Sequence, residues 1–379
     1  MYTNLLPEAQ LQERSQPKKY DLRGEYYRDQ TAIIHSRPFR RLKHKTQVFF
    51  SPHNDHVCTR IEHVLHVATI AASICKGLNQ RNDEKWKLNE ELAYSIGIGH
   101  DLGHPPFGHA GEQALDDMVR PVRRFIHEIN GYRVIEKVYN FGEGMNLTYA
   151  VKDGIICHCG EKFEQKLEPE HKLKNLNLIQ TRANTPSTYE GCIVRFADKI
   201  AYLGRDIEDA LIGKFITKDQ IPANIQEKIG SSNGEIINYL VNDIIKASNR
   251  GIICFSDETY QLFLELKTFN YQCIYTNEKV KEYEDSCKNI VQSLYNFYMN
   301  LLNSNGLDQK LYASNSKKIV QNFGAYLYKM NPFYTKEKSK HNLSDLHTYT
   351  NLVMDYISGM TDNYAIYCMK EINIPSPIL

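Results

Sequence analysis

Residues 97–112 read GIGHDLGHPPFGHAGE. Within thirteen of these residues lie three histidines and two carboxylates, around a turn that glycine and proline make sharp. These ionisable residues are His100, Asp101, His104, His109 and Glu112. Ionisable groups gathered so closely cost desolvation energy unless they pair with one another or bind a cation. The stretch therefore predicts a metal site with acid–base groups beside it.

The sequence on both sides of this turn has the periodicity of helices. Apolar side chains recur every three and four positions over residues 61–78, which predicts an amphipathic helix. Asn89 is typical of a helix start, and the helix that it opens has to end near Asp101, because glycine and two prolines follow. A third helix is predicted to open with the capping-box residues Ser187 and Glu190.

Alternation typical of strands is scarce along the chain. A short hairpin is expected at residues 48–50 or 252–255. Residues 161–182 are predicted to form a long charged loop, either a mobile lid or an arm at an interface, and residues 302–306 are predicted to form another loop. No internal repeat or low-complexity linker interrupts the pattern, so we expect one all-α domain with appended C-terminal helices.

The composition is that of a globular protein, with 42% hydrophobic and 24% charged residues among 379. A formal net charge of +1 excludes a global field that would attract nucleic acid or an anionic membrane, and leaves a local basic cleft open. We expect no signal peptide and no membrane span, and interpret residues 64–75 as a buried helix. Nine cysteines without framework spacing predict a reduced, cytoplasmic protein.

Histidine is concentrated in the first half of the chain. Eleven of the 14 histidines lie between His35 and His158, so we place the chemistry there. The run Cys157-His158-Cys159 has no second ligand pair at zinc-finger spacing. We therefore interpret this run as part of a core helix and not as a structural zinc site.

Two further segments offer ligands for a cation at the turn. His63 and His66 are three residues apart and share one face of a helix. A polar stripe along a later, otherwise apolar helix consists of Asp198, Tyr202, Arg205 and Asp206. Because divalent ions take deprotonated imidazole and carboxylate ligands, the three segments are predicted to meet around one ion.

Each ligand candidate taken alone also has a structural interpretation. His63 would serve equally well as a hydrogen-bonded core histidine, and Asp198 as a helix cap or a salt-bridge partner. The His100-Asp101 turn is harder to explain without an ion, because unpaired charge at the end of an apolar helix is costly.

The order His63, His100-Asp101, Asp198 resembles the metal motif of the HD-domain phosphohydrolases. The flanking segments resemble the dGTPase-like deoxynucleotide triphosphohydrolases within that group. These segments are residues 39–49, 60–63, 100–112, 198–202 and 355–365. The resemblance implies an HD-domain helical fold, with a catalytic core over residues 1–215 and a C-terminal helical region over residues 216–379. Residues 215–345 match no motif of the family.

The implied activity is metal-dependent hydrolysis of dNTPs, dGTP among them, to deoxynucleoside and inorganic triphosphate. The divalent ion, Mn, Mg or Fe, would be held by His63, His100, Asp101 and Asp198. No glycine-rich phosphate loop of the Walker type is present, so phosphate has to be held by the metal and by side chains.

The resemblance also implies roles for residues around the ion. His109 and Glu112 would form an acid–base pair that exchanges a proton with the attacking water or the leaving 5′-oxygen, and His127 would donate to the triphosphate. The residues expected to contact substrate are Gln47, Val48, Arg60, His104, Glu128, Lys199, Tyr202 and Asp206. The lysine would face phosphate, the Tyr202–Asp206 pair the 3′-hydroxyl, and the Gln47-Val48 pair the deoxyribose. His66 and His104 depart from the family pattern.

Two other functions remain open. An HD phosphohydrolase that acts on a 5′-monophosphate or a cyclic nucleotide has the same metal motif. A regulatory protein that senses dNTPs or binds nucleic acid would use the basic clusters at residues 37–45 and 120–124. Relatives form hexamers or tetramers, so we expect a homo-oligomer, with a hexamer favoured. Single-stranded DNA and an effector dNTP are further candidate ligands, and no membrane partner is expected.

Overall fold

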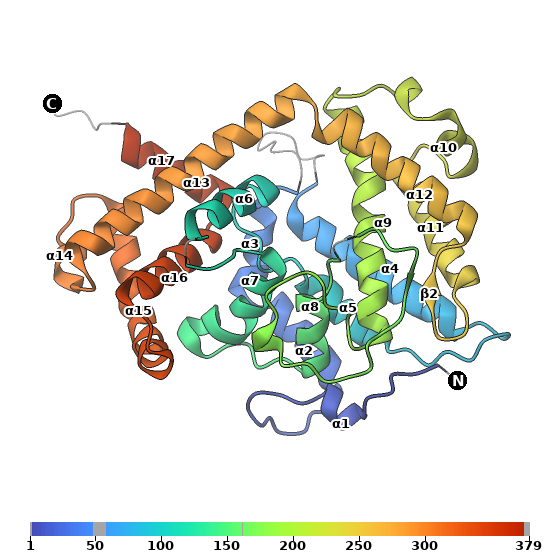
Figure 1. Ribbon diagram of the computed structural model, residues 1–379, viewed down its shortest axis with the longest axis horizontal. Coiled ribbons are helices and arrows are strands. Elements are labelled where there is room, and N and C mark those ends of the chain that lie inside the picture. The colour runs from blue at the N-terminus through green and yellow to red at the C-terminus, as the bar shows by residue number, and fades with distance from the viewer. Residues whose placement is uncertain (1, 48–57, 121, 161, 375–379) are drawn as a thin grey trace.

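The structure is a computed structural model that describes residues 2–47, 58–120, 122–160 and 162–374, and its described residues are mostly helical (Figure 1). The first helices are α1 (Glu8–Leu11), α2 (Glu25–Ile34), α3 (Arg37–Arg41), α4 (Arg60–Asn79), α5 (Glu90–Gly99), α6 (Gly108–Val119), α7 (His127–Arg133), α8 (Tyr149–Ile156) and α9 (Tyr189–Ile212). They are followed by α10 (Ala223–Lys228), α11 (Asn233–Ala247), α12 (Asp257–Asn270), α13 (Glu278–Asn305), α14 (Gln309–Ala313), α15 (Lys318–His341), α16 (Asp345–Ser358) and α17 (Asp362–Asn373). Short 3-10 or π segments are η1 (Leu42–His44), η2 (Val134–Val138), η3 (Tyr139–Gly142), η4 (Leu176–Leu178), η5 (Lys218–Gln220) and η6 (Tyr271–Tyr275). The predicted all-α class is confirmed.

One small sheet interrupts the helices. Strand β1 (Lys166–Leu167) pairs antiparallel with β2 (Ile253–Cys254), with Lys166 opposite Cys254. The expected strand at residues 252–255 therefore forms, but its partner lies far away in the sequence and not in a local hairpin. The alternative hairpin at residues 48–50 lies outside the described residues.

Helix α4 lies at the centre of the first hydrophobic core. A capping box between Thr59 and Glu62 starts it, and it packs against α5, α9 and α11. A Cβ on Gly97 of α5 would lie 2.6 Å from the Cα of Ala68, so glycine is what allows α5 to approach α4 this closely. The close contact brings the C-terminal end of α5 next to the first turn of α4.

By length and composition alone, α4 is the one helix among the described residues that could cross a membrane, with a mean hydropathy of 1.2. We expected no apolar run of that length. Half of its most apolar window is buried and it packs between other helices, as residues 64–75 were predicted to do. This is the environment of a core helix.

The second hydrophobic core surrounds α13, which crosses over α6 in Figure 1. It joins Leu115 of α6 to Val291 and Tyr298 of α13, Phe323 of α15 and Val353 of α16. The C-terminal helices therefore hold α6, which carries the last part of the histidine-rich stretch.

Three local predictions are wrong. Helix α9 is capped by the Thr188 side chain, which accepts from the Gly191 backbone N–H, and not by a Ser187–Glu190 capping box. Glu190 accepts instead from the backbone N–H of Asn89, at 2.7 Å. Residues 302–305, expected in a loop, belong to α13. The Cys157–Cys159 run starts where α8 ends, at its C-cap, and is not part of a core helix.

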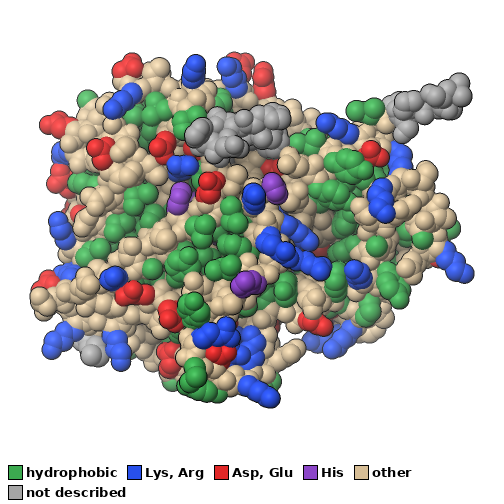
Figure 2. Space-filling model, turned by 180° about the vertical axis from the view of Figure 1, so that it is seen from behind, with side chains coloured by type: hydrophobic (Ala, Val, Ile, Leu, Met, Phe, Trp, Pro, Cys, Tyr) green, Lys and Arg blue, Asp and Glu red, His purple; other side chains and the backbone are tan. Residues whose placement is uncertain are grey.

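Charged and apolar side chains are mixed over the face of the molecule in Figure 2, where a group of Lys and Arg side chains lies near the middle. This mixture agrees with the net charge of +1. Local clusters of one sign are therefore more informative about ligands than the total charge is.

Candidate functional site

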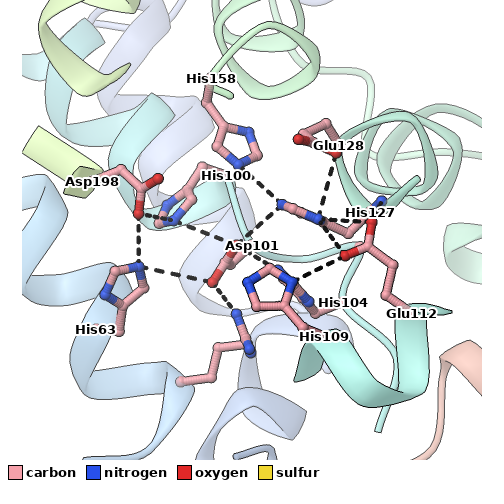
Figure 3. A network of polar contacts seen from close by, with 12 residues as sticks. His63, His100, Asp101, His104, His109, Glu112, His127, Glu128, His158 and Asp198 are labelled. Atoms are coloured by element: carbon pink, nitrogen blue, oxygen red, sulfur yellow. Dashed lines mark hydrogen bonds and ion pairs between the residues drawn. The ribbon is translucent and has the colours of Figure 1, made fainter. Parts of the chain in front are cut away.

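Four predicted metal ligands converge from three helices (Figure 3). His63 lies in the first turn of α4, His100 and Asp101 follow the end of α5, and Asp198 lies in the middle of α9. His63 Nε2 lies 3.1 Å from Asp198 Oδ1, and His100 Nε2 lies 3.4 Å from Asp101 Oδ1 and 3.7 Å from Asp198 Oδ1. Ligand atoms that share one divalent ion lie about 3–4 Å apart, because each bond is about 2.0–2.2 Å long.

His100 gives an independent test of whether these residues fit an ion. Its Nδ1 lies 2.7 Å from the carbonyl oxygen of Gly97, so Nδ1 carries the proton and Nε2 carries the lone pair. That Nε2 is fully buried and has no hydrogen-bond partner among the described residues. A buried lone pair directed at two carboxylates is unfavourable until a cation lies between them. The donor set therefore fits a divalent ion, while His66 is not among the residues that meet here.

The carboxylate ligands are buried and still favour their charged form. Burial alone would raise the pKa of Asp101, but His100, Arg60 and His104 hold it well below its ordinary value. For Asp198 burial is likewise outweighed by the hydrogen bond from His63 and by His100, so its pKa is also lowered. The carboxylates of Asp101 and Asp198 are thus both available as anionic ligands at neutral pH.

Arg60 lies beside the metal cluster and not in an open pocket. Its guanidinium is 2% exposed, forms an ion pair with Asp101 and donates to the backbone oxygen of Thr46 at 3.1 Å. Gln47, which is expected near the deoxyribose, is the residue after Thr46 in the sequence. Its Oε1 is buried without a hydrogen-bond partner among the described residues. Val48 lies outside the described residues.

Glu112 organises the acid–base group. Its carboxylate lies 3.3 Å from His109 Nδ1 and 3.1 Å from His127 Nδ1, and it accepts from the His127 backbone N–H at 2.9 Å. Burial alone would raise the pKa of Glu112, but His127 and the bonds from both imidazoles hold it well below its ordinary range. The His109 side chain is 74% exposed, so its Nε2 is open to a ligand.

Arg182 enters this group from the segment between α8 and α9. It donates to Glu112 Oε1 at 2.9 Å and to Glu128 Oε1 at 2.7 Å. Nothing in the sequence pattern singled out this arginine, because its partner Glu112 lies 70 residues earlier in the sequence. The segment at residues 161–182 is thus fixed to the site at its end.

His104 and His158 complete the group of imidazoles. His104 stacks on His127 with ring centroids 3.8 Å apart, and its Nε2 lies 3.3 Å from Asp101 Oδ1. His158, which the sequence analysis assigned to a core helix, has its Nε2 3.4 Å from His127 Nε2. Its ring centroid is 4.8 Å from that of His100.

The remaining substrate candidates lie along α9. Lys199 pairs with Glu164 at 2.6 Å, and Tyr202 follows one turn later. Asp206 accepts a short hydrogen bond from the hydroxyl of Tyr275. Burial outweighs that hydrogen bond and raises the pKa of Asp206 to about 7. The polar stripe predicted on this helix is present, and it leads from the metal ligands toward η6.

This helical fold and these convergent ligands define an HD-domain protein. The family described as HD domain matches residues 60–203, and the family described as Phosphohydrolase-associated domain matches residues 253–318. The first match contains all four candidate ligands. The second match lies in the region where the sequence offered no motif.

Curated relatives extend the match to nearly the whole chain. The chain is 35% identical over 361 residues to a deoxyguanosinetriphosphate triphosphohydrolase-like protein of Caldanaerobacter subterraneus subsp. tengcongensis, covering 95% of this chain and 88% of the relative. It is 33% identical over 383 residues to the protein of the same description in Desulfatibacillum aliphaticivorans, covering 98% and 94%. The chain belongs to the deoxyguanosinetriphosphate triphosphohydrolase-like family.

Proposed function

We propose that the chain hydrolyses deoxynucleoside triphosphates, dGTP among them, to deoxynucleoside and inorganic triphosphate. The observation that carries the proposal is that His63, His100 and Asp198 come together, with Asp101 next to His100, beside the His109–Glu112 pair in a member of this family. Membership of the family supports the substrate class, and the site supports hydrolysis.

The proposed metal ligands are His63, His100, Asp101 and Asp198, and the ion is Mn, Mg or Fe. When bound, such an ion polarises a phosphoryl oxygen and lowers the pKa of a water. The chain's own part is to hold the ligands before the ion arrives. Arg60 contributes to this, because its buried side chain forms an ion pair with the Asp101 carboxylate and fixes its position. We therefore propose that Arg60 orients a metal ligand.

The proton is moved by His109 in this proposal. Glu112 accepts the Nδ1 proton of His109, so the exposed Nε2 carries the lone pair. This Nε2 can take a proton from the attacking water, and the imidazolium that forms can then give a proton to the leaving 5′-oxygen. His127 donates to the same carboxylate from Nδ1, and we propose that it orients Glu112 for this step. The pairing resembles the general way in which a carboxylate fixes the tautomer of a catalytic imidazole.

Binding of the triphosphate is assigned to His104 and to two cations beside the site. Arg182 and Lys199 are both paired with carboxylates, the arginine with Glu112 and Glu128 and the lysine with Glu164. We propose that phosphate oxygens compete for these cations when substrate enters. Glu128 then acts on substrate through the position of Arg182. At the sugar, Tyr202 and Asp206 supply hydrogen bonds to the 3′-hydroxyl, and the Gln47-Val48 pair packs on the deoxyribose.

Product analysis tests the activity. Purified protein is incubated with each dNTP and NTP plus Mn or Mg, beside the double variant His100→Ala/Asp101→Ala and a sample treated with EDTA. We expect deoxynucleoside and intact triphosphate from dNTPs, and no turnover in either control. Mono- or diphosphate products would place the chain among other HD phosphohydrolases. Absence of turnover with every dNTP mixture would favour a sensing or nucleic-acid-binding role.

We also propose a homo-oligomer, with a hexamer favoured over a tetramer, and an effector dNTP or single-stranded DNA as a further ligand. Exposed apolar side chains such as Leu22 and Leu178 support contacts between copies. A cavity of about 690 Å³ lined by Arg37, Arg40 and Tyr326 supports an anionic ligand. Light scattering with and without dNTPs tests both points. A monomer under all conditions would exclude the oligomer.

A further inference from the structure

Two buried imidazoles face each other beside the candidate metal ligands. His127 Nε2 lies 3.4 Å from His158 Nε2. His158 Nδ1 lies 2.7 Å from the carbonyl oxygen of Ile155, and His127 Nδ1 lies 3.1 Å from Glu112. Each Nδ1 thus has a fixed acceptor, so the two rings face each other through their Nε2 atoms. That contact is satisfied either by a second proton on His127 or by a cation that both Nε2 atoms bind.

Two further ligand atoms come within reach of the same point. The donor atoms of His127, Glu128, His158 and Cys159 all lie within 4.8 Å of one another. The first two residues open α7, and the last two follow the C-cap of α8, so backbone geometry at two helix ends holds the set together. His127, Glu128 and His158 are at least 97% buried, so their charge has to be balanced by buried partners such as Glu112 and Arg182 or by a bound cation.

We propose that these four residues bind a second divalent cation of the zinc class, separate from the ion held by His63, His100, Asp101 and Asp198. Two imidazoles, one carboxylate and one thiolate are ligands that zinc prefers. Around tetrahedral zinc such atoms lie roughly 3.3–3.8 Å apart, which agrees with the His127–His158 distance. On binding, the Cys159 thiol and the His127 Nε2 each lose a proton to solvent, and both imidazoles bind in the neutral form with their remaining proton on Nδ1.

The charges around the site can accommodate this second ion. Four carboxylates, those of Asp101, Glu112, Glu128 and Asp198, face only two guanidiniums, those of Arg60 and Arg182. A first divalent ion brings this group to neutrality, and a triphosphate then adds several negative charges. Asp101 Oδ1 is 3.4 Å from His100 Nε2 and 4.0 Å from His127 Nε2, so the second cation would lie close to the first. It would also lie next to the acid–base group, because His127 contacts Glu112. Its role would be to hold negative charge next to His109 and Glu112.

Metal content tests the proposal without any need for dNTP turnover, so its failure is distinct from failure of the proposed function. The full chain is loaded with Zn²⁺ or Co²⁺, desalted and analysed by mass spectrometry of the elements. We expect two ions per chain in the wild type. His158→Asn and Cys159→Ser should each lose one ion, and His63→Ala should lose the other. Cys254→Ser, a partly buried cysteine elsewhere, is the matched control and should keep two.

Cobalt absorption gives a second measurement, and its result for the wild type does not require any variant to fold. Thiolate coordination adds a sulfur-to-cobalt charge-transfer band in the near ultraviolet, and we expect this band in the wild type and in Cys254→Ser but not in Cys159→Ser. One ion per chain without the band, and a count unchanged by Cys159→Ser, would overturn the proposal. The His127–His158 contact would then be a shared proton.

Discussion

His109 is the residue whose replacement separates chemistry from metal binding. Its side chain is 74% exposed, forms a hydrogen bond with Glu112 and has its ring centroid 5.5 Å from that of His104, so the fold depends little on it. We expect His109→Gln to lower kcat by about 10²–10⁴-fold, the usual contribution of a general acid or base. Metal content should stay at the wild-type value. His347→Gln, an exposed histidine on α16, serves as the control and should keep full activity. Equal losses in both variants would remove His109 from the mechanism.

Asp206 predicts how stability depends on pH. Burial raises its pKa to about 7 in the folded protein, against an ordinary value of 3.8. Between these values the folded chain holds a proton that the unfolded chain releases, so the free energy of unfolding falls as pH rises. The contribution of one such group is about 1.4 kcal/mol per pH unit. Urea denaturation from pH 4 to 7 should therefore show a flatter fall for Asp206→Asn than for the wild type.

The control for this measurement is Asp285→Asn, which replaces an aspartate whose side chain is 72% exposed on α13. It should leave the pH dependence unchanged. If Asp206→Asn and Asp285→Asn give the same slope as the wild type, Asp206 is already ionised in the folded protein.

Single residues also mark what the sequence could and could not predict about the site. The structure brings together His63, His100, Asp101 and Asp198, because each lies on, or directly after, a helix whose apolar stripe was visible. Arg182 was missed because a loop contact leaves no periodic signal. His158 was missed because its partners lie at the start of another helix and not at zinc-finger spacing.

At the scale of elements, the contact between α4 and α5 sets the distance between ligands. A Cβ on Gly97 would meet the Cα of Ala68 at 2.6 Å and its backbone N at 2.9 Å, where nothing flexible can move aside. Gly97→Ala should therefore push the helices apart and lower the free energy of unfolding by about 1–3 kcal/mol. Since His63 lies on α4 and His100 directly follows α5, metal affinity should fall as well. Denaturation and metal titration measure the two effects.

Gly234 on α11 offers the matched glycine. A Cβ there would meet no described atom within 4 Å, so Gly234→Ala should stabilise the helix by about 0.5–1 kcal/mol and leave metal affinity unchanged. Destabilisation by both substitutions to the same extent would show that the α4–α5 contact does not determine the result.

Helix existence was easier to predict than helix ends. The predicted start at Asn89 is confirmed, because its side chain accepts from the Leu92 backbone N–H at 3.0 Å. The predicted start at Ser187 is wrong by one residue, because the Ser187 side chain donates to the buried carboxylate of Asp153 at 3.1 Å. Tertiary hydrogen bonds thus took both residues of the expected capping box, and Thr188 became the cap. Local patterns carry no information about such distant partners.

At the scale of the whole molecule, the late segment around residues 355–365 resembled the family without an obvious task. The structure gives it one. Asp362 accepts from the Thr46 backbone N–H at 2.8 Å and from the Phe107 backbone N–H at 2.9 Å. Lys45 donates to the carbonyl oxygens of both His104 and Ser358. The start of α17 and the end of α16 therefore hold the turn that carries His104. The division of the chain near residue 215 stays a prediction.

Asp362→Asn tests this long-range support. The amide keeps the shape of the carboxylate but puts an N–H₂ group against a backbone donor, at a site that is 2% exposed. Loss of a buried, charge-assisted hydrogen bond should lower the free energy of unfolding by about 1.5–3 kcal/mol. Asp362 touches no candidate metal ligand, but its bonds hold Thr46 and Phe107, and Phe107 lies in the turn that carries His104. We therefore expect kcat to fall as well.

The control for Asp362→Asn is Asp345→Asn at the start of α16, where the carboxylate is 71% exposed and pairs with Lys338. An exposed pair of this kind contributes little, so stability and kcat should stay close to wild type. If Asp362→Asn lost stability while kcat remained unchanged, the C-terminal helices would stabilise the fold without positioning the turn. If stability and kcat fell together, the C-terminal helices α16 and α17 would be what holds His104 and its neighbours in place.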